Sequence, residues 1–176
     1  MKQNILVVSY DYELSKAVAK KLAEEFSMRV FDQIELFEFD HAPKSLSGVL
    51  LELGEEYVMK EFRSIVKMEL DFDGSVFVAD LSIADNCFDL FYRIKLNNFS
   101  VFLYKDREQE LKELKSKKFP TKQMKEFFDI DKESLERCEG LIQRECADIS
   151  VSADNLSVDE IAKLVISKIQ EYYSIE

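Results

Sequence analysis

The sequence has little glycine, proline and cysteine, no tryptophan and no long apolar run. Four glycines and two prolines in 176 residues exclude long flexible linkers and favour a single domain over residues 1–176. No stretch of about 18 apolar residues occurs, so we expect no transmembrane helix. The first residues also lack an apolar segment with a small-residue cleavage site, so we expect no secretion signal.

The three cysteines are odd in number and are not spaced as a zinc or redox pair; they are Cys87, Cys138 and Cys146. Reduced thiols and a cytoplasmic location fit this pattern. The single histidine, His41, has no second histidine for a zinc site and is expected in a surface loop.

Acidic residues outnumber basic ones, which gives a net charge of −11 and a pI of about 4.7. Such a surface repels phosphate backbones and anionic lipids, so we expect no nucleic-acid partner and no membrane partner.

The chain does contain enough apolar residues for a core, at 47% of the total, with 14 Phe and 7 Tyr. Short apolar runs predict five strands, at residues 4–8, 28–31, 74–79, 99–104 and 149–151. Segments with the apolar spacing of helices lie between and after them, at 14–26, 46–70, 88–96, 108–117, 134–145 and 157–172. The last of these begins with a capping box formed by Ser157 and Glu160.

Strands that alternate with helices predict an α/β fold. We expect a three-layer sandwich, in which a five-stranded, mainly parallel sheet has helices on both faces. Residues 118–133 are polar, contain Pro120 and are expected to form a lid or loop. The strand order does not follow from the pattern. Because ligands of such sheets bind beyond the carboxyl ends of the strands, the first strand–helix turn is the place to look for a site.

That turn contains Ser9, Tyr10, Asp11, Tyr12, Glu13, Leu14, Ser15 and Lys16. A phosphate-binding loop at this point needs glycine, because its backbone N–H groups curl around phosphate oxygens. No glycine occurs before Gly48, and Asp11 and Glu13 stand where an anion would approach. Both acids suit a helix N-terminus, and Asp11 is a natural N-cap. We therefore expect this turn to cap its own helix; the alternative is an unusual nucleotide site that uses Lys16.

Several phrases of the sequence resemble the shikimate kinase family, which are small phosphotransferases with a P-loop kinase fold. The phrases are LSKAVAKKLAEEFSMRVFD (14–32), LGEEY (53–57), SVFVADLS (75–82), SVFLYKDREQEL (100–111) and RECADISVSADNLSVDEIAKLVISKI (144–169). They are spread over nearly the whole chain. The resemblance implies a P-loop kinase-like fold, and it implies ATP and Mg²⁺ as cofactors only for a chain that is an active kinase.

The residues of this chain differ from the family's functional residues at most matching positions. In a gapless comparison the two phosphate-loop glycines become Ser9 and Leu14, the lysine becomes Ser15, and the Mg²⁺-binding hydroxyl becomes Lys16. Of the acidic pair after the second strand, only Asp32 remains.

The family's substrate-binding positions are replaced as well. Its arginine on the long helix matches Met59, with Arg63 one helical turn further on, and its lid arginine matches Phe119. Its triple glycine becomes Asp80, Leu81 and Ser82. The resemblance gives these candidate residues for the cleft: Asp32, Met59, Arg63, Asp80, Ser82, Lys118 and Arg137.

Phosphoryl transfer depends on positioning and on neutralising the charge of the transferred group. Because so many of those groups are replaced, we expect no catalytic residue and a pseudo-kinase-like binding or regulatory protein, whose partner is a small metabolite or a protein. One alternative is a small-molecule kinase of the shikimate type with an atypical ATP site around Lys16 and Asp32. Another is a structural partner of a larger complex.

Asp11, Asp32 and Asp80 follow strand ends, but solvated or capping acids are the favoured interpretation, so no metal site is expected. The oligomeric state and the ligand stay open.

Overall fold

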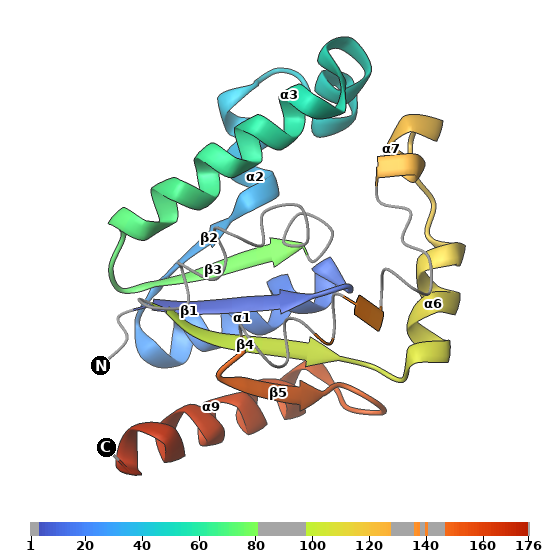
Figure 1. Cartoon of the computed structure of the whole chain (residues 1–176). Helices are drawn as coiled ribbons and strands as arrows, with labels where there is room; N and C mark the ends of the chain where they lie inside the picture. The colour runs from blue at the N-terminus through green and yellow to red at the C-terminus, as the bar shows by residue number, and fades with distance from the viewer. Residues whose placement is uncertain (1–3, 81–97, 128–135, 138–139, 141–146, 176) are drawn as a thin grey trace.

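The structure is a computed structural model of the chain, and it describes residues 4–80, 98–127, 136–137, 140 and 147–175. Its centre is a sheet with the strands β1 (Asn4–Ser9), β2 (Arg29–Asp32), β3 (Ser75–Asp80), β4 (Asn98–Tyr104) and β5 (Ile149–Ser152). The strands lie in the order β2-β3-β1-β4-β5, and each adjacent pair is parallel (Figure 1). The prediction of a five-stranded parallel sheet is confirmed, and β1 lies at its centre.

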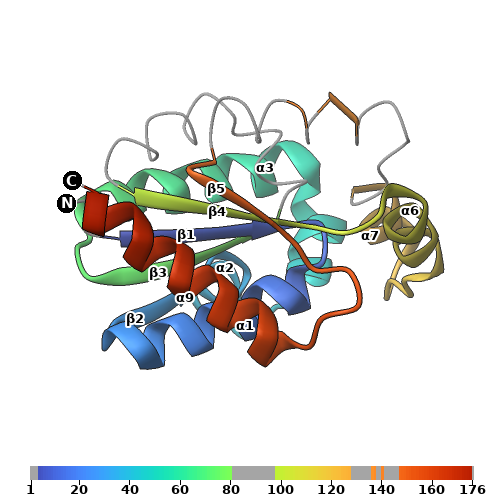
Figure 2. The same cartoon turned by 90° about the horizontal axis from the view of Figure 1, so that it is seen from below.

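Helices cover both faces of this sheet (Figures 1 and 2). The described helices are α1 (Tyr12–Phe26), α2 (Gln33–Asp40), α3 (Leu46–Met68), the 3₁₀ turn η1 (Glu69–Asp71), α6 (Arg107–Ser116), α7 (Lys122–Phe127) and α9 (Val158–Ile175). Helices α2 and α3 lie on one face and α1 and α9 on the other, whereas α6 and α7 lie beyond the carboxyl ends of the strands (Figure 1). The predicted helix 88–96 and most of the predicted helix 134–145 lie outside the described residues, as do the three cysteines and Ser82. None of the described helices is both long and apolar enough to cross a membrane.

Successive side chains of β1 point to opposite faces of the sheet, as in any strand. Leu6 and Val8 lie in one hydrophobic cluster, with residues of α2 and α3. Ile5 and Val7 lie in a second cluster, with residues of α1 and α9. The two clusters give the three layers that the sequence predicts.

The helix α2 was not predicted, and it changes the surroundings of His41. Its apolar residues point in all directions around the helix axis, so the sequence has no helical stripe there; they are Ile34, Leu36, Phe37 and Phe39. His41 follows α2 and is half-buried. Its ring stacks on Phe37 at a centroid distance of 4.3 Å, its Nδ1 lies 2.8 Å from the Phe37 carbonyl, and its Nε2 lies 3.2 Å from the Tyr57 hydroxyl. His41 thus lies in the turn after α2, as predicted, and its ring packs there against Phe37 of α2 and Tyr57 of α3.

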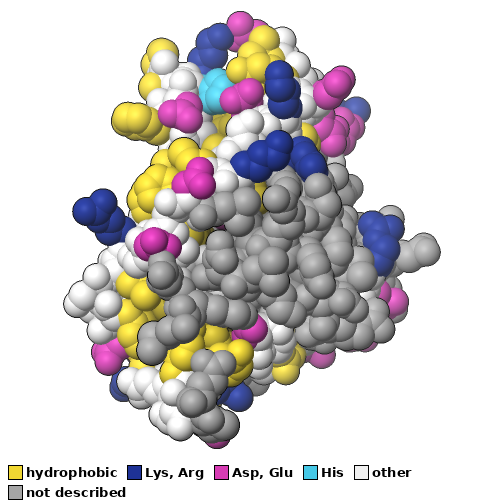
Figure 3. Space-filling view, turned by 60° about the vertical axis from the view of Figure 1, so that its left-hand side comes forward, with side chains coloured by type: hydrophobic (Ala, Val, Ile, Leu, Met, Phe, Trp, Pro, Cys, Tyr) yellow, Lys and Arg dark blue, Asp and Glu magenta, His cyan; other side chains and the backbone are white. Residues whose placement is uncertain are grey.

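Hydrophobic side chains also reach the surface around this histidine (Figure 3). The large exposed ones on α2 and α3 are Phe39, Leu51, Leu53 and, at the far end of α3, Met68. Residues 118–133, the predicted lid or loop, include α7, which lies beside α3 and places Met124 against the core cluster. Whether this segment acts as a lid stays a prediction.

Candidate functional site

Asp11 caps α1 at the point where the chain leaves β1. Its Oδ1 accepts a hydrogen bond from the Leu14 backbone N–H at 3.1 Å, and its own N–H donates to Ser9 Oγ at 3.0 Å. Glu13 adds a second carboxylate in the first turn, where the positive end of the helix dipole lies. The prediction that this turn caps its own helix is confirmed.

Lys105 holds the other oxygen of Asp11. It directly follows β4, the neighbour of β1 in the sheet, and its Nζ lies 2.8 Å from Asp11 Oδ2 and 2.8 Å from Glu113 Oε2 on α6. Burial alone would raise the pKa of Asp11, but the hydrogen bonds from Lys105 and Leu14 outweigh it, so this pKa lies below its ordinary value. Lys105 directly follows a predicted strand, so the sequence marks it as a residue at a strand end. Its pairing with Asp11 could not be predicted, because that requires knowing that β4 lies next to β1.

Asp32 is buried where β2 ends and α2 begins. Its Oδ1 accepts the backbone N–H groups of Ile34 at 3.0 Å and Glu35 at 3.1 Å, and it also accepts the Tyr12 hydroxyl. Burial, and then the hydrogen bond to Asp32, raises the pKa of Tyr12. Asp32 therefore serves as the N-cap of α2 and as the acceptor for Tyr12.

Lys16 lies between two carboxylates. Its Nζ forms an ion pair with Glu35 and lies 3.3 Å from Asp32 Oδ2. The hydrogen bond to Glu35 is the main reason that the pKa of Lys16 is raised. Glu35 was missed in the sequence because α2 was missed. The charge of Lys16 is thus balanced inside the chain.

The other residues of the turn are mostly packed. Tyr10 is buried in the cluster under α3, Ser15 is fully buried, and Leu14 packs against the cluster under α1. These side chains fill the space next to β1 and support the turn.

The structure brings few of the remaining predicted cleft residues together. Met59 on α3 packs against the core, and Arg63, one turn later, is half-buried and has a partner of its own. Asp80 ends β3 in register with Ser9. Lys118 and Arg137 are exposed, and Arg137 also has a partner. Within the described ranges, no three His, Cys, Asp or Glu side chains are arranged to hold a metal ion.

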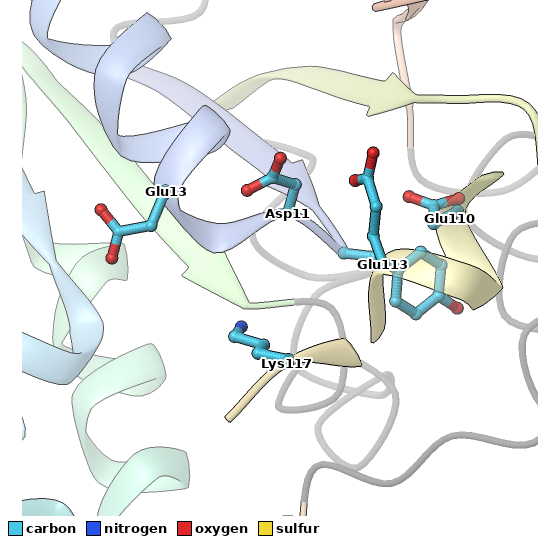
Figure 4. Close-up of a pocket in the computed structure, with 6 residues that line it drawn as sticks. Asp11, Glu13, Glu110, Glu113 and Lys117 are labelled. Atoms are coloured by element: carbon cyan, nitrogen blue, oxygen red, sulfur yellow. The ribbon is translucent and has the colours of Figure 1, made fainter. Parts of the chain in front are cut away.

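Two adjoining cavities lie next to the turn. The first, of about 220 Å³, is lined by Tyr10, Asp11, Glu13, Glu110, Glu113 and Lys117 (Figure 4). The second, of about 180 Å³, has a largely apolar lining that includes Tyr12, Ile34, Leu46, Phe119 and Met124. Glu13 and Lys117 line both cavities, so they stand at the border between them. The sequence offered no signal for the second cavity, because α2 and α7 build much of it.

No protein-family model and no curated protein matches this sequence. Solved structures, in contrast, are similar over almost the whole chain. The shikimate kinase of Aquifex aeolicus superposes with a TM-score of 0.72 and 16% identity, over 97% of this chain and 98% of that one. The shikimate kinase of Acinetobacter baumannii, solved in complex with shikimate, gives a TM-score of 0.75 and 14% identity, over 97% of this chain and 94% of that one.

A third similar structure is the shikimate kinase of Bacteroides thetaiotaomicron, with a TM-score of 0.70, 15% identity, and 98% of each chain covered. At these identities the likeness concerns the fold and not the chemistry. The resemblance read from the sequence phrases is confirmed at that level: the chain has a shikimate kinase-like, P-loop NTPase-like α/β fold, with its sheet in the order β2-β3-β1-β4-β5.

Proposed function

We propose that this chain is a non-catalytic binding or regulatory protein on a shikimate kinase-like fold. The observation that carries the proposal is the start of α1, where Asp11 accepts the Leu14 N–H and pairs with Lys105. A phosphate loop leaves the N–H groups of this turn available for phosphate oxygens. In this chain a carboxylate takes that place, and an incoming phosphate would have to displace Asp11 and pass Glu13.

The charges around the turn support the same proposal. Phosphoryl transfer needs cations that neutralise the transferred group. Lys16 is engaged by Glu35 and Asp32, and Lys105 is engaged by Asp11 and Glu113. To redirect Lys16 to a nucleotide would leave the buried Asp32 without its counter-ion, at a cost on the order of a few kcal/mol. We therefore assign both lysines to the chain's own carboxylates and propose a small metabolite or a protein as the partner, in the cytoplasm.

A thermal-shift titration of the full chain tests this function with Mg-ATP, Mg-ADP and shikimate as separate probes. A ligand at 100 times its dissociation constant adds about 2.7 kcal/mol to the free energy of unfolding. We expect neither nucleotide to raise the melting temperature at millimolar concentration, and no transfer of phosphate to shikimate. The shikimate kinase of Acinetobacter baumannii, measured in parallel, shows that the assay detects binding.

Two variants make the result specific. Lys16→Ala removes the amine next to Asp32, and Lys20→Ala removes an exposed amine one turn further along α1. A shift with Mg-ATP that is lost in Lys16→Ala and kept in Lys20→Ala would overturn the proposal in favour of a kinase-type nucleotide site. Each variant is compared with its own ligand-free melting temperature, because Lys16→Ala removes the ion pairs to Asp32 and Glu35 and is expected to lower the stability of the ligand-free chain.

A further inference from the structure

The chemistry at the border of the two cavities indicates what kind of ligand fits the cleft. Glu13 comes from the first turn of α1, and Lys117 comes from the segment after α6, so two distant parts of the chain place opposite charges at one opening (Figure 4). Both side chains are exposed. Among the described residues, neither forms an ion pair; Lys117 has its Nζ 5.8 Å from the centre of the Phe119 ring. A carboxylate and an ammonium group thus line the same two cavities and are available to a ligand.

The other charges near this opening already have partners. Asp11 and Glu113 share Lys105, and Glu38 accepts the backbone N–H of Leu46 at 2.9 Å. Glu110, the remaining acid of the first cavity, is buried and also has a partner. The lining of the second cavity is otherwise dominated by apolar and aromatic side chains, with Ile34, Leu46 and Met124 among them. A ligand in this cleft therefore meets one positive group and one negative group at the opening, and an apolar pocket behind them.

We propose that the cleft binds a small zwitterion with an apolar side chain, which is the chemistry of a free hydrophobic amino acid. The ammonium group of the ligand pairs with Glu13, its carboxylate pairs with Lys117, and its side chain enters the cavity formed by Ile34, Leu46, Phe119 and Met124. This inference rests on the proposed function, because it needs a cleft that holds a ligand and not a nucleotide. The ammonium group pairs with an acid beside the turn that an incoming phosphate would have to pass, so the charge preference there is for a cation.

The size of the cleft limits the ligand to a small molecule. Each cavity lies below the lower bound of about 300 Å³ for pockets that enclose a drug-sized ligand. A single apolar side chain fits the second cavity, whose volume is about 180 Å³. Phosphate-rich ligands are disfavoured, because Asp11, Glu13 and Glu113 line the first cavity.

Isothermal titration calorimetry on the full chain tests the proposal with matched probes. L-leucine, L-methionine and L-phenylalanine carry both charges, 3-phenylpropanoate lacks the ammonium group, and 2-phenylethylamine lacks the carboxylate. We expect at least one of the three amino acids to bind, and both single-charge probes to bind at least about tenfold more weakly than L-phenylalanine, because each loses one charge-assisted hydrogen bond.

Variants assign the two charges separately. Glu13→Gln is expected to weaken amino-acid binding by about tenfold and to leave the binding of 3-phenylpropanoate unchanged. Lys117→Met is expected to weaken amino-acid binding by about tenfold as well, but to leave the binding of 2-phenylethylamine unchanged. Lys118→Met removes the neighbouring exposed amine, which lines neither cavity, and should change nothing. The proposal is overturned if none of the three amino acids binds at millimolar concentration. It is also overturned if Glu13→Gln and Lys117→Met bind the amino acids with the same affinity as the unaltered chain. If Mg-ATP also fails to bind in that case, the non-catalytic function survives and only the ligand class is wrong.

Discussion

At the scale of single residues, the buried pair of Gln33 and Glu69 joins the start of α2 to the start of η1. Gln33 Nε2 donates to Glu69 Oε1 at 2.8 Å, and both side chains are almost completely buried. Burial raises the pKa of Glu69 to about 8, and the Gln33 hydrogen bond opposes this only in part. Gln33 Oε1 and Glu69 Oε2 have no hydrogen-bond partner among the described residues. When Glu69 is protonated, its Oε2–H can donate a hydrogen bond to Gln33 Oε1, so one proton gives both atoms a partner.

The pair predicts a pH dependence of stability. Unfolded Glu69 loses its proton near pH 4.5, whereas the folded chain keeps it up to about pH 8. The folded state binds more protons between these values, so its stability falls as the pH rises through this window. Glu69→Gln keeps an amide that pairs with Gln33 and carries no charge. We expect it to be more stable than the unaltered chain at about pH 9, by on the order of 2–4 kcal/mol.

Urea unfolding of both proteins at about pH 5 and about pH 9 measures this difference. Glu56→Gln, a change at an exposed acid on α3, is the matched control and should follow the unaltered chain. If Glu69→Gln loses as much stability as the unaltered chain between the two pH values, Glu69 is ionised in the folded state and the paired-proton interpretation is wrong.

At the scale of one element, α3 contains two glycines with different backbone geometry. Gly54 has φ 81° and ψ 173°, a conformation that only glycine adopts readily, and it kinks the helix. Gly48 is helical, and a Cβ added there would lie 3.8 Å from its nearest neighbours, which is ordinary contact. The break in α3 therefore lies at Gly54 and not at Gly48.

The two glycines therefore form a matched test. Gly54→Ala is expected to lower the free energy of unfolding by about 1–3 kcal/mol, because alanine is strained at that φ even though the space is open. Gly48→Ala is expected to raise it by about 0.5–1 kcal/mol, because alanine loses less backbone entropy in a helix. Chemical denaturation followed by circular dichroism measures both. Equal effects of the two substitutions would show that α3 is not kinked at Gly54 in solution.

At the scale of the whole molecule, the strand order decides which backbone is protected. β1 pairs with β3 on one side and β4 on the other, whereas β2 and β5 lie at the edges of the sheet. All the apolar side chains of β1 are buried, and they reach both hydrophobic clusters. Opening β1 therefore requires both layers to open.

Amide hydrogen exchange should show this arrangement. We expect the amides of β1 to exchange most slowly, at the rate of global unfolding, and the amides of β2 and β5 to exchange earlier by local opening. Mass spectrometry of peptides from each strand measures the rates. In mild denaturant the rates of the edge strands and of β1 should converge as global unfolding takes over. If, without denaturant, the amides of β2 and β5 exchange as slowly as those of β1, the order β2-β3-β1-β4-β5 is contradicted or a partner covers the edge strands.

Much of the fold was predictable because burial on two faces leaves a direct pattern in the sequence. The apolar run at β1 and the repeat of Val18 and Leu22 in α1 both reflect a side chain that packs against the sheet. The capping box at α9 was also readable, since Glu160 N–H donates to Ser157 Oγ at 3.3 Å and Ser157 N–H donates to Glu160 Oε2 at 2.8 Å. By contrast, β2 begins and ends one residue later than predicted, at Arg29 and Asp32.

By itself, the sequence determined the alternation of strands and helices, the self-capping turn at Asp11 and the absence of a glycine-rich loop, because these depend on neighbouring residues. Only the tertiary structure decided that Lys105 neutralises Asp11, that Glu35 and Asp32 hold Lys16, and that Glu13 and Lys117 border the same cavities. The physical reason is that such contacts join residues far apart in the chain. They are set by the strand order and by how α2, α6 and α7 pack, and no local pattern encodes that arrangement.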